Sequence, residues 1–275
     1  MTPHEQVQVQ CKALALPTAA RLFAELAATA TREGWSVERF TAEWLGHELE
    51  GRRQQRVVRL RHEAHLPGDK TLAALEQQRL PLRLRRVLPE LCRGDFVERA
   101  VNLLLFGLPG RGKTHYAAAV GHELVEQGRT VLFTPTYALV GRLLRAKRDL
   151  ELERELRRLD RFAVVILDDI GYVQQSREEM EVLFTFLAER YERRSVVITS
   201  NVVFSEWTRI FHDPLTTAAA IDRVVHHSII LEFGADMPSV RAEAAAQRQR
   251  GSQSTPPPAL PADPASTDDQ SKQER

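Results

Sequence analysis

The residues best suited to chemistry in this chain lie in a glycine-rich turn between Gly107 and Thr114. The letters G-L-P-G-R-G-K-T fit the pattern G-x-x-x-x-G-K-[ST] of a phosphate-binding loop. Glycines let backbone N–H groups approach a polyphosphate, and a helix that begins at Lys113 adds its own free N–H groups. The turn therefore predicts a nucleoside triphosphate site rather than a chance connection between a strand and a helix.

Two side chains of this turn have specific predicted roles. Lys113 is expected to reach the β- and γ-phosphates, and the Thr114 hydroxyl is expected to hold Mg²⁺. The backbone of the turn is expected to surround the phosphates. The loop residues predicted to bind the nucleotide are Gly107, Leu108, Pro109, Gly110, Arg111, Gly112, Lys113 and Thr114.

Polar residues follow two of the later apolar runs. Asp168 and Asp169 come directly after the run at 163–167, and Asn201 ends the run that starts at 195. An acid at the end of a buried strand beside a phosphate loop is where P-loop ATPases hold Mg²⁺. We predict that Asp168 holds the metal, directly or through water. Asp169 is predicted to face the attacking water. Asn201 is predicted either to orient that water or to contact the γ-phosphate.

Arg223 precedes the last apolar run. An arginine in this position could reach the γ-phosphate of a neighbouring subunit and stabilise charge in the transition state. It could equally form a surface ion pair with Asp222. The residues alone leave these two interpretations open.

The elements that must position these residues are short strands and helices in alternation. Five apolar runs read as strands buried on both faces, and helices are expected between them. This order predicts an α/β fold with a five-stranded, mostly parallel sheet and right-handed crossovers. The predicted strands are 102–106, 130–134, 163–167, 195–199 and 228–233, and the main helices are 113–127, 137–159 and 177–193.

The chain divides into four predicted regions. Residues 1–66 form a helical N-terminal domain that binds DNA or a partner, with one helix opened by Pro17 and another capped by Ser36. A linker at 67–98, with a short helix from position 71, leads to an ATPase domain at 99–245. Residues 246–275 are rich in polar residues and proline, which predicts a disordered tail.

Charge is distributed unevenly although the 275 residues sum to a net charge of +1. Arg52, Arg56 and Arg59 are spaced i, i+4, i+7, so they share a helix face that suits phosphates. The alternative is an ordinary solvated face. Two cysteines, no long apolar run and no signal peptide predict a cytoplasmic protein without disulfides or membrane spans.

Several motifs in order resemble the family of IstB-like ATP-binding proteins, helper ATPases of insertion-sequence transposition related to DnaC and DnaA. The matching stretches lie within about residues 10–241. They are L-A-L-P at 14–17, K-T-L at 70–72, the loop from Gly107 extended to His115, L-D-D-I-G-Y at 167–172, R-Y-E at 190–192, T-S-N at 199–201, E-W at 206–207 and I-D-R-V-V-H-H at 221–227.

This resemblance implies an AAA+ domain with the phosphate-loop strand central and ATP and Mg²⁺ as cofactors. Asp168 matches the Mg²⁺-coordinating acid, Asp169 the catalytic acid, Asn201 the sensor residue and Arg223 the arginine finger. His115 matches the end of the nucleotide-binding loop. Family members bind duplex DNA, assemble as a ring or filament with ATP at subunit interfaces, and deliver or activate a cognate transposase.

Two departures from the AAA+ pattern qualify the expected activity. Position 169 is Asp where many AAA+ ATPases have Glu, so slow, DNA-stimulated hydrolysis is expected. Arg111 occupies a variable slot, and Arg241 is a loose match to a second sensor. The alternatives are a DnaC-like helicase loader and an adaptor with little hydrolysis, while a small-molecule kinase is disfavoured because no substrate lid is visible.

Overall fold

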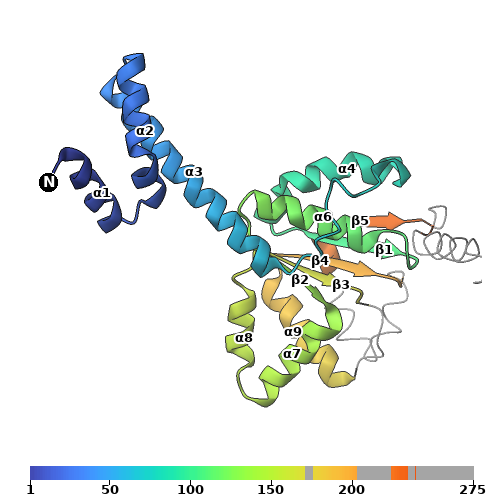
Figure 1. Cartoon of the computed structure of the whole chain (residues 1–275). Helices are drawn as coiled ribbons and strands as arrows, with labels where there is room; N and C mark the ends of the chain where they lie inside the picture. Colours follow the sequence, from blue (N-terminus) through green and yellow to red (C-terminus); the bar gives the residue numbers. More distant parts are fainter. Residues whose placement is uncertain (171–175, 203–223, 235–238, 240–275) are drawn as a thin grey trace, which may run out of the picture.

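The computed structural model describes residues 1–170, 176–202, 224–234 and 239. These residues form a helical arm and an α/β body (Figure 1). The arm consists of α1 (Pro3–Ala13), α2 (Pro17–Glu33) and α3 (Val37–Ala64). In Figure 1 the start of α3 lies with α2 far from the sheet, and its end reaches the body. None of the described helices is long and apolar enough to cross a bilayer.

Local signals in the sequence explain where the arm helices begin and end. Pro17 opens α2, and Ser36 caps α3 by accepting a hydrogen bond from the Arg39 amide. Gly34 ends α2 in the left-handed conformation with φ +61°. The predicted starts at Pro17 and Ser36 are confirmed, and the α3 helix continues past Arg61 as expected.

The body contains a five-stranded sheet of order β2-β3-β4-β1-β5, and every neighbouring pair is parallel. The prediction of an α/β fold is confirmed. The predicted sheet was mostly parallel, whereas the observed sheet is parallel throughout. β1 is an interior strand between β4 and β5, while β4 takes the middle place. The strands are β1 (Asn102–Gly107), β2 (Val131–Pro135), β3 (Val164–Asp168), β4 (Ser195–Ser200) and β5 (Ser228–Phe233).

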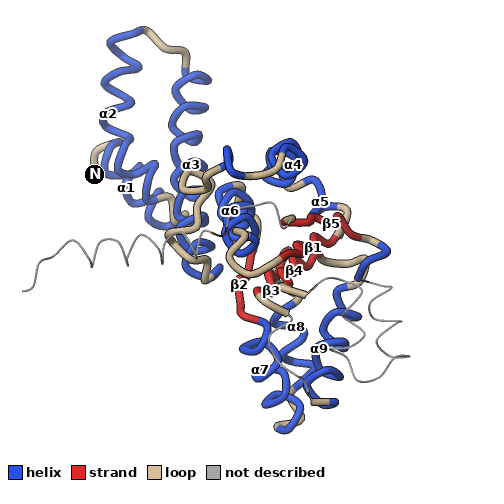
Figure 2. The backbone as a smooth tube through the Cα atoms, turned by 90° about the vertical axis from the view of Figure 1, so that its right-hand side faces the viewer, coloured by secondary structure: helices blue, strands red, loops and turns tan. Residues whose placement is uncertain are grey.

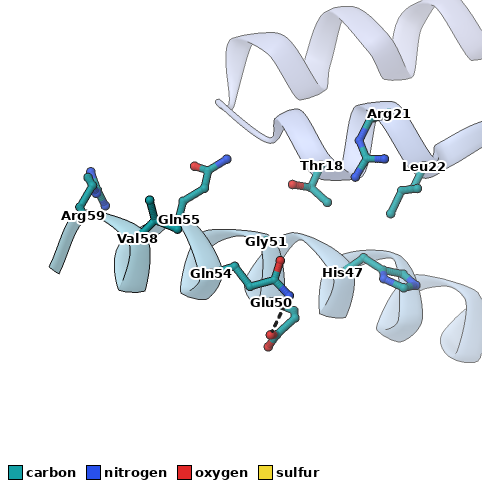
Figure 3. Close-up of a pocket in the computed structure, with 10 residues that line it drawn as sticks. All are labelled: Thr18, Arg21, Leu22, His47, Glu50, Gly51, Gln54, Gln55, Val58 and Arg59. Carbon is teal, nitrogen blue, oxygen red and sulfur yellow. Dashed lines mark hydrogen bonds between the residues drawn. The ribbon is translucent and has the colours of Figure 1, made fainter. Parts of the chain in front are cut away.

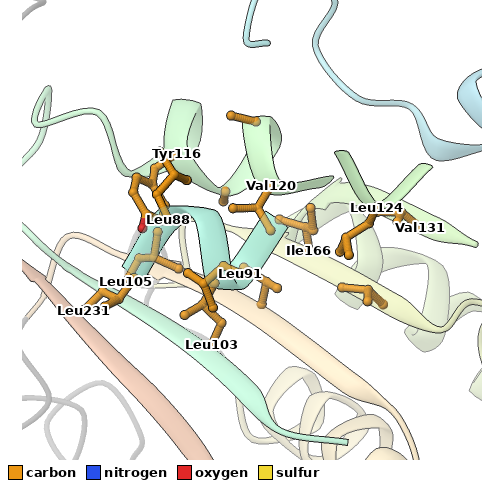
Figure 4. Close-up of a cluster of buried hydrophobic side chains, with 14 of the residues drawn as sticks. Leu88, Leu91, Leu103, Leu105, Tyr116, Val120, Leu124, Val131, Ile166 and Leu231 are labelled. Atoms are coloured by element: carbon orange, nitrogen blue, oxygen red, sulfur yellow. The ribbon is translucent and has the colours of Figure 1, made fainter. Parts of the chain in front are cut away.

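Helices cover both faces of the sheet (Figure 2). Leu103 and Leu105 of β1 face a core shared with α4 (Leu82–Arg93) and α6 (Lys113–Glu126), which Figure 4 shows in close-up. Leu104 and Phe106 face the opposite core, shared with α7 (Thr136–Arg148), α8 (Leu152–Leu159) and α9 (Arg177–Arg190). Burial on both faces is the reason for the uninterrupted apolar runs.

The segment predicted as a linker, residues 67–98, is mostly helical from residue 77 to its end. It holds a 3-10 turn (Gln77–Arg79), the helix α4 and the short helix α5 (Asp95–Glu98). Leu84, Leu88 and Leu91 of α4 are buried in the core against the sheet. Pro89 suggested a break, yet it lies inside α4, where buried leucines on both sides of it hold the helix in place.

Two further helix predictions differ from the structure. The segment from position 71 forms a turn, in which Thr71 Oγ1 accepts a hydrogen bond from the Ala74 amide. The predicted helix 137–159 is two helices, α7 and α8, because Leu150 adopts φ +59° between them. Neither glycine nor proline marks this break, so the charged, leucine-rich pattern predicted one continuous helix.

Arg190 at the end of α9 joins three parts of the body. Its guanidinium donates to the carbonyls of Leu159, Phe162, Ala163 and Ser195 at 2.9–3.3 Å. The residue is 2% exposed, and burial lowers the pKa of its guanidinium to about 9. A single side chain thus ties the end of α8 and the start of β3 to the start of β4.

Candidate nucleotide-binding site

β1 feeds directly into the predicted phosphate loop. Its last residue, Gly107, has φ +145° and is paired with Phe233 of β5. A Cβ atom at this position would lie 2.2 Å from the Phe233 carbonyl oxygen, so only glycine fits. Gly110 and Gly112 also have positive φ values of 79° and 89°. The loop backbone therefore has the curvature that brings N–H groups round a phosphate.

Helix α6 begins at Lys113, directly after Gly112, as predicted. Lys113 is only 5% exposed. Its Nζ donates to the carbonyl oxygens of Gly107 at 2.6 Å and Leu108 at 2.9 Å, and to Oδ1 of Asn201 at 2.8 Å. The lysine therefore lies folded against its own loop and contacts the residue that directly follows β4.

The two acids and the amide predicted from the sequence come together at the ends of β3 and β4. Asn201 Nδ2 donates to Oδ1 of Asp169 at 2.9 Å. Thr199 Oγ1 donates to Oδ1 of Asp168 at 2.7 Å and accepts from the Asp169 amide at 2.8 Å. Lys113, Asn201 and Asp169 form one hydrogen-bonded chain, and Thr199 joins Asp169 to Asp168. The functional side chains predicted at these positions thus lie in one cluster.

The residues fit ATP and Mg²⁺. The loop offers a buried cation in Lys113, and Nε of Arg111 is buried without a hydrogen-bond partner in the described part of the chain. An anionic ligand would give Nε of Arg111 a partner and would offer Lys113 phosphate oxygens in exchange for its present contacts. The hydroxyl of Thr114 and the carboxylate of Asp168 are oxygen donors, the type that Mg²⁺ requires. Leu108 is 49% exposed at the loop and offers an apolar surface.

The side chain of His115 contacts the segment that follows α3. Its ring Nε2 lies 3.0 Å from the carbonyl oxygen of Thr71, in the chain that follows α3. One face of α6 continues these contacts: His122 Nε2 lies 3.0 Å from the Pro67 carbonyl oxygen, and Arg61 forms two bonds of 2.6 and 2.5 Å with Glu126. The helix that starts at the loop lysine is therefore attached along its length to α3 and the segment after it.

The three arginines proposed for DNA contact have different surroundings. Arg52 donates to Glu48 at 2.9 Å and to the Ala15 carbonyl at 2.7 Å, and Arg56 donates to the Gly128 carbonyl at 3.2 Å. Both therefore contact other parts of this chain. Arg59 lies at one end of an open groove of about 710 Å³ between α2 and α3. Arg21 extends from α2 toward α3 in the same groove (Figure 3).

Arg223 and Arg241 lie outside the described residues, as do residues 246–275 of the predicted tail. The described residue next to Arg223 is Val224, whose carbonyl oxygen accepts a hydrogen bond of 3.3 Å from Asn102 Nδ2. Asn102 is 6% exposed at the start of β1 and also accepts from the Val196 amide at 2.9 Å.

Thr199 is the residue of this cluster to which the sequence-based prediction assigned no role of its own. The signal that could have found it is strand alternation, because residues i and i+2 of a strand point to the same face. Once Asn201 is placed beside the acids, Thr199 must lie on the same side of β4.

The chain is similar to known proteins over most of its length. The family model described as "IstB-like ATP binding protein" matches residues 9–247. The "Putative insertion sequence ATP-binding protein y4iQ/y4nD/y4sD" of Sinorhizobium fredii is 44% identical over 239 residues, which cover 86% of this chain and 80% of that protein. The "Insertion sequence IS21 putative ATP-binding protein" of Pseudomonas aeruginosa is 41% identical over 189 residues, 69% and 71% of the two chains.

Solved structures support the fold. A crystal structure of DnaI superposes with a TM-score of 0.51 at 20% identity and covers 62% of this chain and 95% of its own. AMPPCP-bound DnaA from Aquifex aeolicus superposes with a TM-score of 0.50 at 17% identity, covering 68% and 56%. At these identities the likeness concerns the fold alone, which this chain shares with DnaI and DnaA.

Proposed function

Because this chain belongs to the family of IstB-like ATP-binding proteins, we propose that it hydrolyses ATP as a helper of insertion-sequence transposition. The observation that carries the proposal is the chain of hydrogen bonds from Lys113 through Asn201 to Asp169. It joins the phosphate loop to a carboxylate that could act on water. A protein that only binds nucleotide has no need of a carboxylate and an amide in this arrangement.

Each residue of the cluster has a role in this proposal. Lys113 binds the β- and γ-phosphates after leaving the carbonyls of its own loop, and Thr114 and Asp168 hold Mg²⁺. Bound Mg²⁺ neutralises the charge that develops on the phosphates. Asp169 accepts a hydrogen bond from the attacking water and Asn201 orients that water. Asp169 is one methylene shorter than the Glu common at this position, so hydrolysis is slow.

We propose further that Arg223 completes the site of a neighbouring subunit. Val224, the next residue in the chain, is held at the start of β1 by Asn102, whereas the phosphate loop follows Gly107 at the other end of the strand. A strand of six residues spans about 17 Å, which exceeds the reach of an arginine side chain. In this proposal Arg223 therefore acts on another subunit's ATP and not on its own. The proposed assembly is a ring or filament with ATP at its subunit interfaces.

The assembled protein is proposed to hold duplex DNA through its phosphates and to recruit or activate a transposase. Arg59 and Arg21, which line the groove of the helical arm, are the candidates for phosphate contact. Contact of this kind carries little sequence information and depends strongly on salt. DNA stimulates hydrolysis in this proposal because it brings subunits, and with them Arg223, together.

Mixing two inactive variants tests the shared site. Lys113→Ala lacks the loop lysine but keeps the arginine, and Arg223→Ala has the opposite defect. Each is expected to lose hydrolysis alone, and an equal mixture with ATP and duplex DNA is expected to recover part of the wild-type rate. Recovery fails if the arginine serves its own subunit. Wild-type protein that binds ATP without DNA-stimulated hydrolysis would favour the adaptor function instead.

Duplex binding is tested separately by fluorescence anisotropy with ATP across a range of salt. The affinity is expected to fall steeply as the salt concentration rises. Arg59→Ala is expected to reduce the slope of log affinity against log salt concentration by about one, which corresponds to one counterion. Absence of duplex binding from low to moderate salt contradicts the DNA proposal. Pull-down of the transposase from the neighbouring reading frame, with a replicative helicase as the competing bait, distinguishes the helper from a helicase loader.

A further inference from the structure

We propose that Thr199 is a positioning residue of the nucleotide site, whose one hydroxyl fixes both acids and thereby sets how strongly Mg²⁺ strengthens nucleotide binding. The inference rests on the proposed roles of Asp168 and Asp169. It adds to them a residue that touches neither nucleotide nor water. Its test uses binding as well as hydrolysis, so it can fail independently of the proposed ATPase activity.

The hydroxyl of Thr199 makes two hydrogen bonds of opposite sense. It donates its proton to Oδ1 of Asp168 at 2.7 Å and accepts from the amide of Asp169 at 2.8 Å. The backbone carbonyl of the same residue accepts from the Ile170 amide at 3.0 Å. Three consecutive residues that follow the buried part of β3 are thus held by one residue of β4.

The bond to the Asp169 amide explains how a short acid reaches its partner. Asp169 has φ +60°, a left-handed conformation that residues other than glycine adopt at a cost of about 1–3 kcal/mol. The Thr199 hydroxyl holds the amide of this residue, and the turned backbone brings Oδ1 of Asp169 to 2.9 Å from Asn201 Nδ2. Backbone geometry stabilised by Thr199 therefore sets the position of the Asp169 carboxylate beside Asn201.

The bond to Asp168 orients the carboxylate predicted to hold Mg²⁺. Thr199 is 1% exposed, so water does not compete for its hydroxyl. A carboxylate with one oxygen fixed by a hydroxyl donor loses rotational freedom. Partners of this kind behind a metal ligand typically change metal affinity or activity about 10–100-fold when removed.

Thr199 of β4 and Asn201, which directly follows that strand, divide the work. Thr199 contacts Asp168, and Asn201 contacts Asp169. Ser200 between them bonds to the Val202 carbonyl at 2.9 Å. The motif T-S-N thus contains two functional side chains separated by a structural one.

Thr199→Val and Thr199→Ser test the hydroxyl. Val keeps the shape of Thr without the hydroxyl, and Ser keeps the hydroxyl without the methyl group. Thr136→Val is the matched control, because Thr136 is equally buried and its Oγ1 donates to the backbone carbonyl of Asp168 at 3.1 Å rather than to the carboxylate. The probe is a fluorescent ATP analogue, titrated with Mg²⁺ and again with EDTA, alongside thermal unfolding and steady-state hydrolysis.

In EDTA, Thr199→Val is expected to bind the analogue with the same affinity as wild type. The increase in affinity that Mg²⁺ causes is expected to be about tenfold smaller in the variant than in wild type. Its kcat is expected to fall about 10–100-fold with little change in KM. Thr199→Ser and Thr136→Val are expected to stay within about threefold of wild type. If Thr199→Val fails to fold, Thr199→Ala compared with Thr199→Ser isolates the hydroxyl in the same way.

Two results would overturn the proposal. One is a Thr199 variant without the hydroxyl whose affinity responds to Mg²⁺ as strongly as wild type does. The other is a serine variant that is as impaired as the variants without a hydroxyl, because shape rather than hydrogen bonding would then be the requirement.

Discussion

The ammonium group of Lys113 donates a hydrogen bond of 2.8 Å to Oδ1 of Asn201. The same ammonium group also donates to the carbonyls of Gly107 and Leu108, so the loop lysine is held by its own chain. Binding of a triphosphate must exchange these contacts for phosphate oxygens. Asn201 therefore gains freedom when nucleotide binds, and this would let the amide respond to the nucleotide state.

Substitutions of Asn201 test this relationship. Asn201→Ala is expected to lower kcat about 10–100-fold with little loss of ATP affinity, because the lysine is released but the water loses its orienting amide. Asn201→Asp is expected also to weaken ATP binding, since a carboxylate would hold Lys113 in an ion pair. Equilibrium binding and steady-state kinetics on both variants measure this. Equal ATP affinity in the two variants would contradict the competition for Lys113.

Gly107→Ala is predicted to damage both the loop and the sheet. Its Cβ would meet the backbone of Phe233 at 2.2 Å, and backbone of a paired strand cannot move aside cheaply. We expect a loss of at least about 2 kcal/mol in the free energy of unfolding, together with lost ATP binding.

Gly112→Ala is the matched control for this prediction. Gly112 also has a positive φ of 89°, but a Cβ there meets no atom within 4 Å. ATP binding is expected to suffer, since the phosphate approach is obstructed, while stability falls by only about 1 kcal/mol. Urea unfolding without nucleotide separates the two variants, and equal destabilisation would show that contact with Phe233 is unimportant.

The sequence predicted the parts of the site that depend on local patterns. The glycine spacing located the loop, and the apolar runs located all five strands to within one residue at either end, because burial on both faces leaves an uninterrupted signal. The gathering of Asp168, Asp169 and Asn201 followed from parallel strands, whose carboxyl ends share one edge. These are consequences of topology that a single chain can reveal.

Other parts depended on tertiary contacts that no local pattern records. Pro89 inside α4 is tolerated because buried leucines hold the helix, and Leu150 interrupts a pattern that looked continuous. Arg52 and Arg56 are spaced like a phosphate-binding row, yet carbonyl oxygens of their own chain take part of their hydrogen-bonding capacity. An arginine face in a sequence does not tell which of its members remain available to a ligand.

Arg190 is predicted to be irreplaceable by lysine. Its planar guanidinium serves four carbonyl oxygens at once, and a lysine ammonium has neither the width nor the number of donors. Arg190→Lys is expected to lower the free energy of unfolding by at least about 2 kcal/mol, because buried carbonyls lose their partners. Urea unfolding followed by circular dichroism measures this loss.

Arg193→Lys is the control for Arg190. Arg193 is in the same segment, but its side chain is 59% exposed and contacts the carboxylates of Asp160 and Glu189. Exposed ion pairs contribute little, so the substitution is expected to change stability by less than about 0.5 kcal/mol. Similar losses in the two variants would refute the structural role assigned to Arg190.

Glu48 of α3 is predicted to hold the helical arm together in a pH-dependent way. The side chain is almost completely buried and accepts hydrogen bonds of 2.9 Å from the amides of Thr18 and Ala19 and from Arg52. Burial alone would raise the pKa of Glu48, but these hydrogen bonds outweigh it and lower the pKa. The charged form therefore stabilises the first turn of α2.

The direction of this pKa shift sets the pH at which the contribution disappears. A depressed carboxyl pKa gives stability that is fully present above the unfolded value of about 4.3 and is lost as pH falls through the folded value. Glu48→Gln is expected to lower the free energy of unfolding by about 1–3 kcal/mol at pH 7, with the difference from wild type shrinking below about pH 4.

Trp44, whose indole donates to the Ala19 carbonyl at 2.7 Å, reports unfolding at this junction by fluorescence. Glu50→Gln, an exposed change on the same helix, is expected to stay within about 0.5 kcal/mol at every pH. A Glu48→Gln effect that is independent of pH would mean that shape, and not charge, joins α2 to α3.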